Sequence, residues 1–242
     1  MKDDIKLLKK EFKRIKSMGI IESLRRGSTG VGYTFETLLN KKEDHESKPD
    51  FGSVEIKCKL GYSKSNLTLF NCVPTRQGVP ALQYLFEKYG YRHQTRDEEY
   101  KLFEREIFST YAIKRWGYEF KLKVDYYLME VALNAYNNNI FVEKVCAWNF
   151  KILERKLKNK LTYMALVEAY PYKRDNKQCY KYVKMNMFKL RGFFEFLQLI
   201  ERDKVYVSFY LREAHGEGMS QHGVAFKIKK SCLEELFWKY RY

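Results

Sequence analysis

One stretch of the chain decides the fold: Pro49-Asp50-Phe51-Gly52-Ser53-Val54-Glu55-Ile56-Lys57. Its second half has the composition of a strand, in which successive side chains point to opposite faces. We therefore expect Glu55 and Lys57 to share one face, and Val54 and Ile56 the other. Asp50 precedes the strand across a Gly-Ser turn and brings a second carboxylate toward the face of Glu55 and Lys57.

These residue types suit the hydrolysis of a phosphodiester. Carboxylates and a backbone carbonyl are hard oxygen ligands for Mg²⁺, so Asp50, Glu55 and the carbonyl of Ile56 are candidate ligands. The reaction needs an activated water and relief of charge on the phosphate, and Lys57 is placed to orient the water and stabilise negative charge. The pattern resembles the PD-(D/E)XK motif of nuclease active sites. The same residue types also occur by chance on solvated strand faces of highly charged proteins, so a solvated face is the alternative interpretation.

The composition indicates a basic globular protein. The 242 residues include 46 Lys and Arg against 30 Asp and Glu, a net charge of +16. A hydrophobic content of 45% and an aromatic content of 17% exclude a generically disordered chain. Because the basic residues are spread along the chain rather than gathered in a tail, they favour a long nucleic-acid footprint over an anionic membrane.

The sequence indicates a protein of a reducing cytoplasm. Residues 1–14 are charged throughout, and no window approaches the roughly 18 apolar residues of a spanning helix. The five cysteines are dispersed, with no Cys-X-X-Cys pair, so neither a disulfide framework nor a zinc site is expected.

Periodicity predicts a mixed α/β (α+β) fold, with a partly antiparallel sheet flanked by helices. The predicted helices cover residues 4–17, 33–39, 79–89, 150–160 and 190–200. The predicted strands cover residues 54–58, 67–70, 119–133, 139–149, 161–168, 180–188, 205–211 and 224–228, and residues 233–238 close the chain. The first two strands are expected to form a β-hairpin, and a turn at Asn137-Asn138-Asn139 is expected to separate the strands at 119–133 and 139–149.

A glycine-rich loop, residues 27–32, follows Arg26 and precedes the second predicted helix. It lacks the Lys-Ser/Thr pair of a P-loop and the preceding strand of a dinucleotide-binding loop. Two interpretations remain: a plain turn, or a phosphate contact in which Arg26 and Thr29 take part.

The order of motifs resembles the MvaI/BcnI group of MutH-like restriction endonucleases. The resemblance rests on the glycine loop through Glu36, on Pro49-Asp50 with Glu55-Ile56-Lys57, and on residues 67–70, 88–90, 93–95 and 222–228. Residues 96–204 carry little recognisable motif. The resemblance implies a PD-(D/E)XK nuclease-like mixed central sheet in a single unit over residues 1–242, which can divide into two lobes around a DNA cleft. Its catalytic lobe would cover about residues 1–95 with parts of the middle, and its recognition elements about residues 200–230.

The resemblance also implies an activity: a Mg²⁺-dependent type II endonuclease that cuts double-stranded DNA at a short, GC-rich site and acts as a monomer. Asp50 and Glu55 would be metal ligands, Lys57 the catalytic lysine and Glu36 an additional catalytic acid. Without the resemblance, Glu36 reads as an ordinary solvated helix residue.

Base contacts are implied near positions 93 and 222. Useful side chains for reading base edges include His, Gln, Arg and Lys. The sequence departs from the group in having Lys227 where Arg is expected and in lacking an Asp-X-Arg pattern on the strand before it. The candidate DNA-binding residues are His93, Gln94, Arg212, His215, His222, Lys227, Arg26 and Thr29. Candidates for phosphate contacts are Lys151, Arg155, Lys156, Lys158, Lys160, Lys173, Arg174, Lys177, Lys181 and Lys184.

Two other functions fit the same residues. One is a MutH-like, strand-specific nickase of mismatch repair that depends on a partner protein. The other is a DNA-binding protein without catalysis. A restriction enzyme would need a cognate DNA methyltransferase as a functional partner, with no stable complex expected.

Overall fold

The computed structural model describes residues 2–41, 48–63, 65–94, 99–110, 117–213 and 219–240, without the side chains of residues 99 and 219–222. The chain forms two compact units. Unit 1 comprises Met1–Ser65, Lys156–Arg191 and Phe237–Tyr242, and unit 2 comprises Asn66–Arg155 and Gly192–Leu236. Both units combine sheets with helices, so the predicted mixed α+β class is confirmed.

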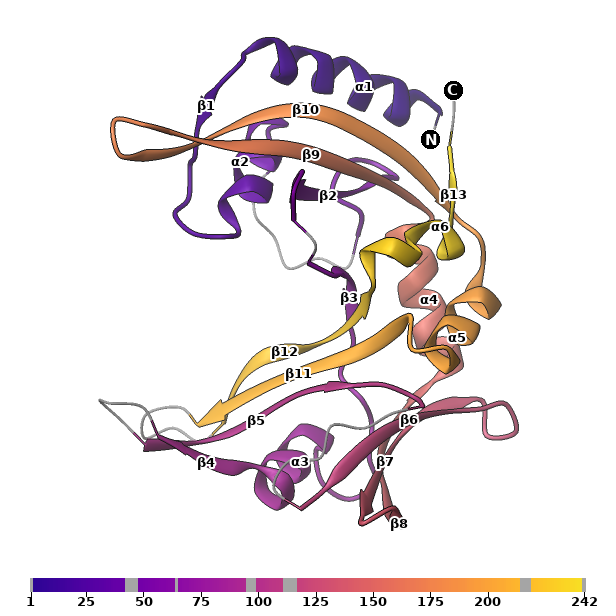
Figure 1. The fold of residues 1–242 in the computed structure, drawn as a ribbon. Coiled ribbons are helices and arrows are strands. Elements are labelled where there is room, and N and C mark those ends of the chain that lie inside the picture. Colours follow the sequence, from indigo (N-terminus) through magenta and orange to yellow (C-terminus); the bar gives the residue numbers. More distant parts are fainter. Residues whose placement is uncertain are drawn as a thin grey trace. The chain divides into compact units, whose positions relative to one another are not determined.

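Unit 1 is built on one mixed sheet, which can be followed in Figure 1. The strand order is β1-β10-β9-β2, and β13 pairs with β10. Strand β2 runs parallel to β9, and the other pairs are antiparallel. The elements of this unit are α1 (Lys2–Ser17), β1 (Ile21–Glu22), α2 (Gly30–Leu38), β2 (Glu55–Leu60), β9 (Tyr163–Arg174), β10 (Lys177–Leu190) and β13 (Phe237–Lys239).

Helix α1 packs on this sheet through one apolar stripe. Its buried residues recur at steps of three and four, the spacing that brings side chains onto one helix face. Phe35 of α2 contacts Phe12 of α1 and Tyr182 of β10, with ring centroids 6.4 and 5.0 Å apart. Val54 and Ile56 belong to the same buried cluster. The apolar face of the predicted strand therefore faces the core of unit 1.

Unit 2 contains two antiparallel sheets, with orders β3-β12-β11-β5-β4 and β6-β7-β8. Trp148, Phe209 and Phe226 pack together in its core. The strands are β3 (Leu67–Asn71), β4 (Tyr91–Gln94), β5 (Glu99–Ile107), β6 (Glu119–Asp125), β7 (Glu130–Asn137), β8 (Ile140–Asn149), β11 (Val205–Glu213) and β12 (Met219–Ile228). The helices are α3 (Ala81–Tyr89), α5 (Phe193–Glu201), a 3-10 turn at Lys230–Cys232 and α6 (Leu233–Leu236); α4 (Phe150–Leu161) runs from unit 2 into unit 1.

The hairpin predicted from residues 54–58 and 67–70 is wrong. Both segments are strands, but β2 pairs with β9 in unit 1 and β3 pairs with β12 in unit 2. Strands that are adjacent in the sequence often pair, and no local sequence feature opposes the pairing of these two segments. Here β2 pairs with β9, which lies more than a hundred residues further along the chain. Local periodicity does not reveal such a distant partner.

The single strand predicted over residues 119–133 is also wrong, because a turn divides it into β6 and β7. The carboxylate of Asp125 accepts hydrogen bonds from the backbone N–H groups of Tyr127 and Leu128, at 3.1 and 2.9 Å. An aspartate that bonds to the backbone two residues on is a turn former. Strands β4 and β5 were not predicted.

The hairpin between β7 and β8 is confirmed, since Asn138 and Asn139 have φ angles of 49° and 65°. Two successive residues with positive φ are typical of the type I′ turn that joins twisted strands. Asp175 and Asn176 join β9 to β10 in the same way, with φ angles of 50° and 59°.

All five cysteines are free thiols. Within the described part of the chain, no helix has the length and apolarity needed to cross a bilayer.

Neighbouring leucines of α1 provide a matched test of the core of unit 1. Leu8 is completely buried, whereas Leu7 is 50% exposed. We expect Leu8→Ala to lower the free energy of unfolding by about 2–5 kcal/mol, because it removes buried methyl groups and leaves a cavity. Leu7→Ala should change it by about 0.5 kcal/mol or less. Urea unfolding followed by circular dichroism measures both, and equal effects would contradict the packing of α1.

Candidate active site

A tight turn places Asp50 beside strand β2. Phe51 and Val54 exchange two backbone hydrogen bonds of 2.9 Å across Gly52 and Ser53. Gly52 has a φ of 56°, and a Cβ there would lie 2.6 Å from the carboxyl carbon of Asp4. Ser53 donates to Asp4 from its N–H and its hydroxyl, at 3.2 and 2.8 Å. Helix α1 thus anchors the turn that was predicted between Asp50 and the strand.

Both carboxylate oxygens of Asp50 accept hydrogen bonds. Oδ2 accepts from the backbone N–H of Ile56 at 2.9 Å, and Oδ1 accepts from Nζ of Lys41 at 2.6 Å. Burial opposes ionisation of Asp50, but the bonds from Lys41 and Ile56 outweigh it, and the pKa lies below its ordinary value. Asp50 is therefore ionised and oriented toward β2.

Glu55 and Lys57 lie on the same side of β2, as the alternation predicts, with Nζ of Lys57 2.6 Å from Oε1 of Glu55. Nζ of Lys160, in the last turn of α4, lies 3.5 Å from the same oxygen. The side chain of Glu55 is 1% exposed, and its Oε2 is buried without a hydrogen-bond partner. Burial raises the pKa of Glu55, although Lys57 opposes that rise.

Glu36 comes to the same site from α2. The glycine that begins this helix is required, because a Cβ on Gly30 would clash with the carbonyl oxygen of Arg25. The hydroxyl of Tyr182 on β10 donates to the carbonyl of Val31 at 2.8 Å and ties the helix to the sheet. Burial and then the negative charge of Asp50 raise the pKa of Glu36 to about 7. Below that pH, Glu36 is a neutral acid.

The residues at this site fit a divalent metal ion in part. Among the described residues, no three His, Cys, Asp or Glu side chains gather into a ready metal-binding group. Asp50 and Glu55 nevertheless supply carboxylate oxygens, the hard donors that Mg²⁺ prefers. The unpartnered Oε2 of Glu55 is the kind of buried acceptor that an added cation would satisfy. Two carboxylates with water and a backbone carbonyl remain a chemically suitable set.

The glycine loop presents its two candidate residues to solvent. Arg26 and Thr29 are both exposed, and Thr29 makes no side-chain hydrogen bond to the start of α2. Gly27 has a φ of 86°, which favours glycine. The loop therefore turns the chain into α2 and leaves Arg26 and Thr29 accessible to a ligand.

In unit 2, His93 and Arg212 both contact the ring of Tyr100. His93 pairs with Tyr100 across strands β4 and β5, with ring centroids 5.3 Å apart. The guanidinium carbon of Arg212, on β11, lies 3.9 Å from the centre of the Tyr100 ring. Sequence reasoning missed Tyr100, because the strand that carries it was not predicted.

The other DNA-binding candidates are less constrained. Gln94 is exposed at the end of β4, and Nζ of Lys227 on β12 lies 4.0 Å from Oε1 of Glu106, at the limit of an ion pair. The side chain of His222 and the whole of His215 lie outside the described residues.

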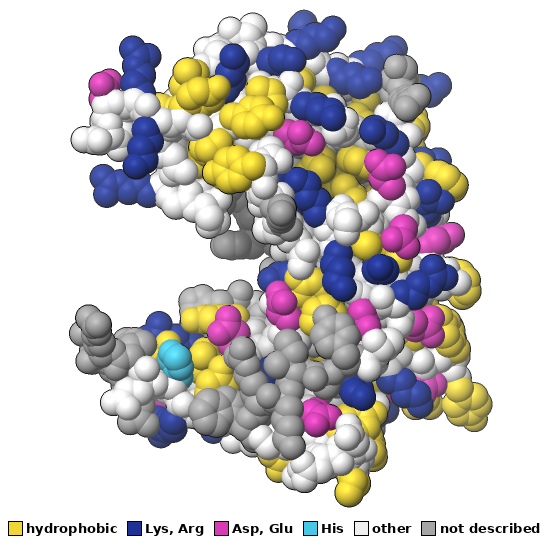
Figure 2. Space-filling view, in the orientation of Figure 1, with side chains coloured by type: hydrophobic (Ala, Val, Ile, Leu, Met, Phe, Trp, Pro, Cys, Tyr) yellow, Lys and Arg dark blue, Asp and Glu magenta, His cyan; other side chains and the backbone are white. Residues whose placement is uncertain are grey.

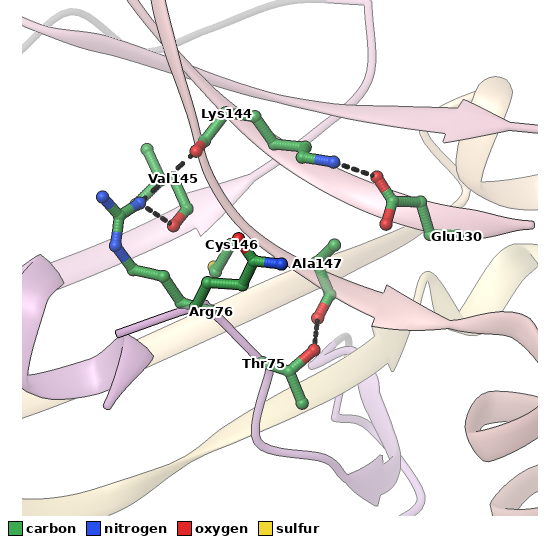
Figure 3. A pocket seen from close by; sticks show the side chains of 8 residues that line it. Thr75, Arg76, Glu130, Lys144, Val145, Cys146 and Ala147 are labelled. Atoms are coloured by element: carbon green, nitrogen blue, oxygen red, sulfur yellow. Dashed lines mark hydrogen bonds and ion pairs between the residues drawn. The ribbon is translucent and has the colours of Figure 1, made fainter. Parts of the chain in front are cut away.

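A polar pocket of about 610 Å³ is lined by residues of unit 2 alone. As Figure 3 shows, Arg76 bonds the carbonyl of Val145, Lys144 pairs with Glu130, and Thr75 bonds the carbonyl of Ala147. These bonds tie the segment after β3 to the β6-β7-β8 sheet. The pocket contains none of the candidate catalytic residues, so it is not the candidate site.

Two lysines beside the acidic residues were not assigned to the site from the sequence. Lys41 falls in a polar stretch without any pattern, and no local signal identifies it. Lys160 was expected only as a phosphate contact.

Figure 2 shows Lys and Arg side chains spread over the face drawn, intermixed with Asp and Glu, rather than gathered in one patch.

Comparisons with known proteins gave a match to one family model and matches to solved structures. The model of the MvaI/BcnI restriction endonuclease family matches residues 9–237. A solved complex of restriction endonuclease MvaI with its cognate DNA substrate matches at a TM-score of 0.87 and 28% identity, covering 98% of each chain. The structure of MvaI in the absence of DNA matches at a TM-score of 0.62 and 25% identity, covering 99% of this chain and 98% of that one. No curated protein sequence matches.

Glu36 provides a pH test of the site. Its pKa rises from an ordinary 4.5 to about 7 on folding. Its contribution to the free energy of unfolding is therefore present below about pH 4.5 and is lost as the pH rises through about 7. Carboxyl ¹³C NMR of the metal-free protein should show Glu36 titrating near pH 7, and at lower pH in Asp50→Asn, which removes a like charge. Glu22→Gln, at an exposed ion pair, is the control. An ordinary Glu36 titration would contradict its burial.

Proposed function

The chain belongs to the MvaI/BcnI restriction endonuclease family, and we propose that it is a Mg²⁺-dependent type II endonuclease that hydrolyses double-stranded DNA at a short, GC-rich site. The observation that carries the proposal is the buried carboxylate of Glu55 bonded to Lys57, with Asp50 held against the same strand. That combination of acids and a lysine is the one that phosphodiester hydrolysis needs.

Asp50, Glu55 and the backbone carbonyl of Ile56 would hold the metal ion. The oxygen donors and the unpartnered Oε2 of Glu55 support this assignment. When bound, Mg²⁺ supplies Lewis acidity and lowers the pKa of a coordinated water. A cation at this site would also offset the cost of ionising Glu55 in a buried position.

Lys57 would act on the phosphate and the water. Its ammonium has three donors, of which one bonds Glu55 and the others are available to a phosphate oxygen or a water. A positive charge there stabilises the negative charge that develops on the phosphate. Glu36, with a pKa of about 7, can hold a proton at its carboxyl group or release it near neutral pH. We assign Glu36 to proton handling and water positioning.

DNA binding would combine charge with base contacts. A net charge of +16 favours association with DNA through release of counterions. The cluster of His93, Tyr100 and Arg212 supports base recognition by unit 2, because the aromatic ring holds the Arg212 fork in a defined orientation. The remaining DNA-binding candidates are Gln94, His215, His222 and Lys227, with Arg26 and Thr29 near the glycine loop.

The two units suggest a division of labour. All four catalytic candidates, Asp50, Glu55, Lys57 and Glu36, belong to unit 1, and His93, Arg212 and Lys227 belong to unit 2. We assign hydrolysis to unit 1 and sequence recognition to unit 2. The solved relative in complex with cognate DNA supports DNA as the substrate. The enzyme would act as a monomer in the bacterial cytoplasm, alongside a methyltransferase that protects the host sites.

Digestion of a fully sequenced genome tests the activity. With Mg²⁺ and no other protein, the fragment ends should share one short motif. Asp50→Ala and Lys57→Ala should each slow cleavage by about 100-fold or more, because each removes part of the charge stabilisation. Lys144→Ala, at an ion pair in unit 2, is the control and should cut normally.

Other outcomes would redirect the assignment. Cleavage that needs a second protein would indicate a repair nickase. Salt-sensitive binding without any cleavage would indicate a DNA-binding protein. Normal cutting by Asp50→Ala or Lys57→Ala would show that the catalytic residues lie elsewhere.

Arg212 tests recognition separately from binding. In Ca²⁺, Arg212→Ala should reduce discrimination between cognate and scrambled duplexes by about 1–3 kcal/mol, as expected for loss of a two-pronged base contact. Lys177→Ala, an exposed lysine at the β9–β10 turn, should weaken binding to both duplexes alike and lower the salt dependence. Filter binding at two salt concentrations measures this difference. If Arg212→Ala weakens both duplexes equally, Arg212 contacts only the backbone.

A further inference from the structure

Asp50 and Glu55 are prepared differently for a metal ion. Glu55 leaves Oε2 without a partner, whereas both oxygens of Asp50 are already bonded. The second of these bonds comes from Lys41, whose Nζ lies 2.6 Å from Oδ1. One of the two proposed acidic ligands is therefore occupied by a cation that belongs to the chain.

The Lys41–Asp50 pair is not an ordinary surface ion pair. The two side chains are only 17% and 14% exposed, so water screens their interaction weakly. The backbone N–H of Lys41 donates to the carbonyl of Glu36 at 3.1 Å, directly after α2. The segment that carries Glu36 into the site thus also delivers the ammonium to Asp50.

The position of this ammonium matters because two cations repel each other at a shared oxygen. A metal ion bound to Oδ1 and an ammonium 2.6 Å from the same atom would lie within a few ångströms of one another, in a site where charges are poorly screened. Lys57 and Lys160 raise no such conflict at Glu55, since both lie at Oε1 and Oε2 stays open.

We propose that Lys41 is a built-in competitor of the metal ion, which holds Asp50 in the metal-free enzyme and must leave Oδ1 before the ion can bind there. The proposal rests on the metal site assigned under the proposed function. Until the ion arrives, Lys41 provides the positive charge that keeps Asp50 ionised and correctly oriented. The apparent metal affinity is then the intrinsic affinity multiplied by the fraction of molecules in which Lys41 has left Asp50.

Metal binding to the DNA-free protein tests the proposal without depending on cleavage. The probe is Mn²⁺, and free Mn²⁺ is measured by electron paramagnetic resonance. Lys41→Met keeps the length of the side chain and removes its charge, and it should lower the apparent Kd for Mn²⁺ by about tenfold. Asp50→Ala should weaken Mn²⁺ binding in both backgrounds.

Substitutions of two other lysines distinguish competition for Asp50 from a general effect of charge on metal affinity. Lys160→Met removes a positive charge from the same site without touching Asp50, and it should change the Kd by less than about threefold. Lys144→Met breaks an ion pair of similar length, 2.7 Å, in unit 2 and should change nothing. Equal tightening in Lys41→Met and Lys160→Met, or no tightening in Lys41→Met, would overturn the proposal.

A second measurement uses the unaltered protein. A crystal structure with Ca²⁺ should show Nζ of Lys41 more than about 4 Å from Oδ1 of Asp50, beyond ion-pair distance. Retention of the Lys41–Asp50 bond beside a bound ion would refute the competition even if the enzyme cuts DNA with Mg²⁺. Absence of Mg²⁺-dependent cutting would instead refute the proposed function.

Discussion

The candidate site depends on one constraint: an almost completely buried carboxylate must be compensated by positive charge. Glu55 is 1% exposed at the start of β2, and an isolated charge in that position would be strongly unfavourable. Lys57 from the same strand and Lys160 from α4 supply part of this charge, and burial still raises the pKa of Glu55. The compensation links α4 to β2, although they lie far apart in the sequence, and it leaves one oxygen of Glu55 open to a further cation.

The opposite face of β2 fixes the position of the site in unit 1. Val54 and Ile56 are buried in the core of unit 1, so the backbone that carries Glu55 and Lys57 is held by packing and by the parallel ladder with β9. Asp4 of α1 anchors the turn that carries Asp50. A single strand therefore presents its chemistry on one face and its apolar residues on the other, and core packing determines the positions of the acids.

The sequence recognition that we assign to unit 2 would depend on a different feature, the geometry of its hydrogen-bond donors. Lys227 is a point charge where the family pattern has Arg, and a planar two-pronged donor is missing at that position. The stacking of Arg212 on Tyr100 provides such a donor on another strand of the same sheet. Under the proposed function, Arg212 rather than Lys227 would therefore supply the two-pronged base contact.

The sequence by itself determined what depends on neighbouring residues: the helix α1, the alternation that puts Glu55 and Lys57 on one face, and the asparagine turn between β7 and β8. These follow from backbone periodicity and turn preferences, which act within a few residues. Only the tertiary structure decided that β2 pairs with β9, that Lys41 and Lys160 reach the acids, and that Glu36 has a pKa of about 7. Strand pairing and desolvation depend on residues that are distant in the chain, so no local pattern encodes them.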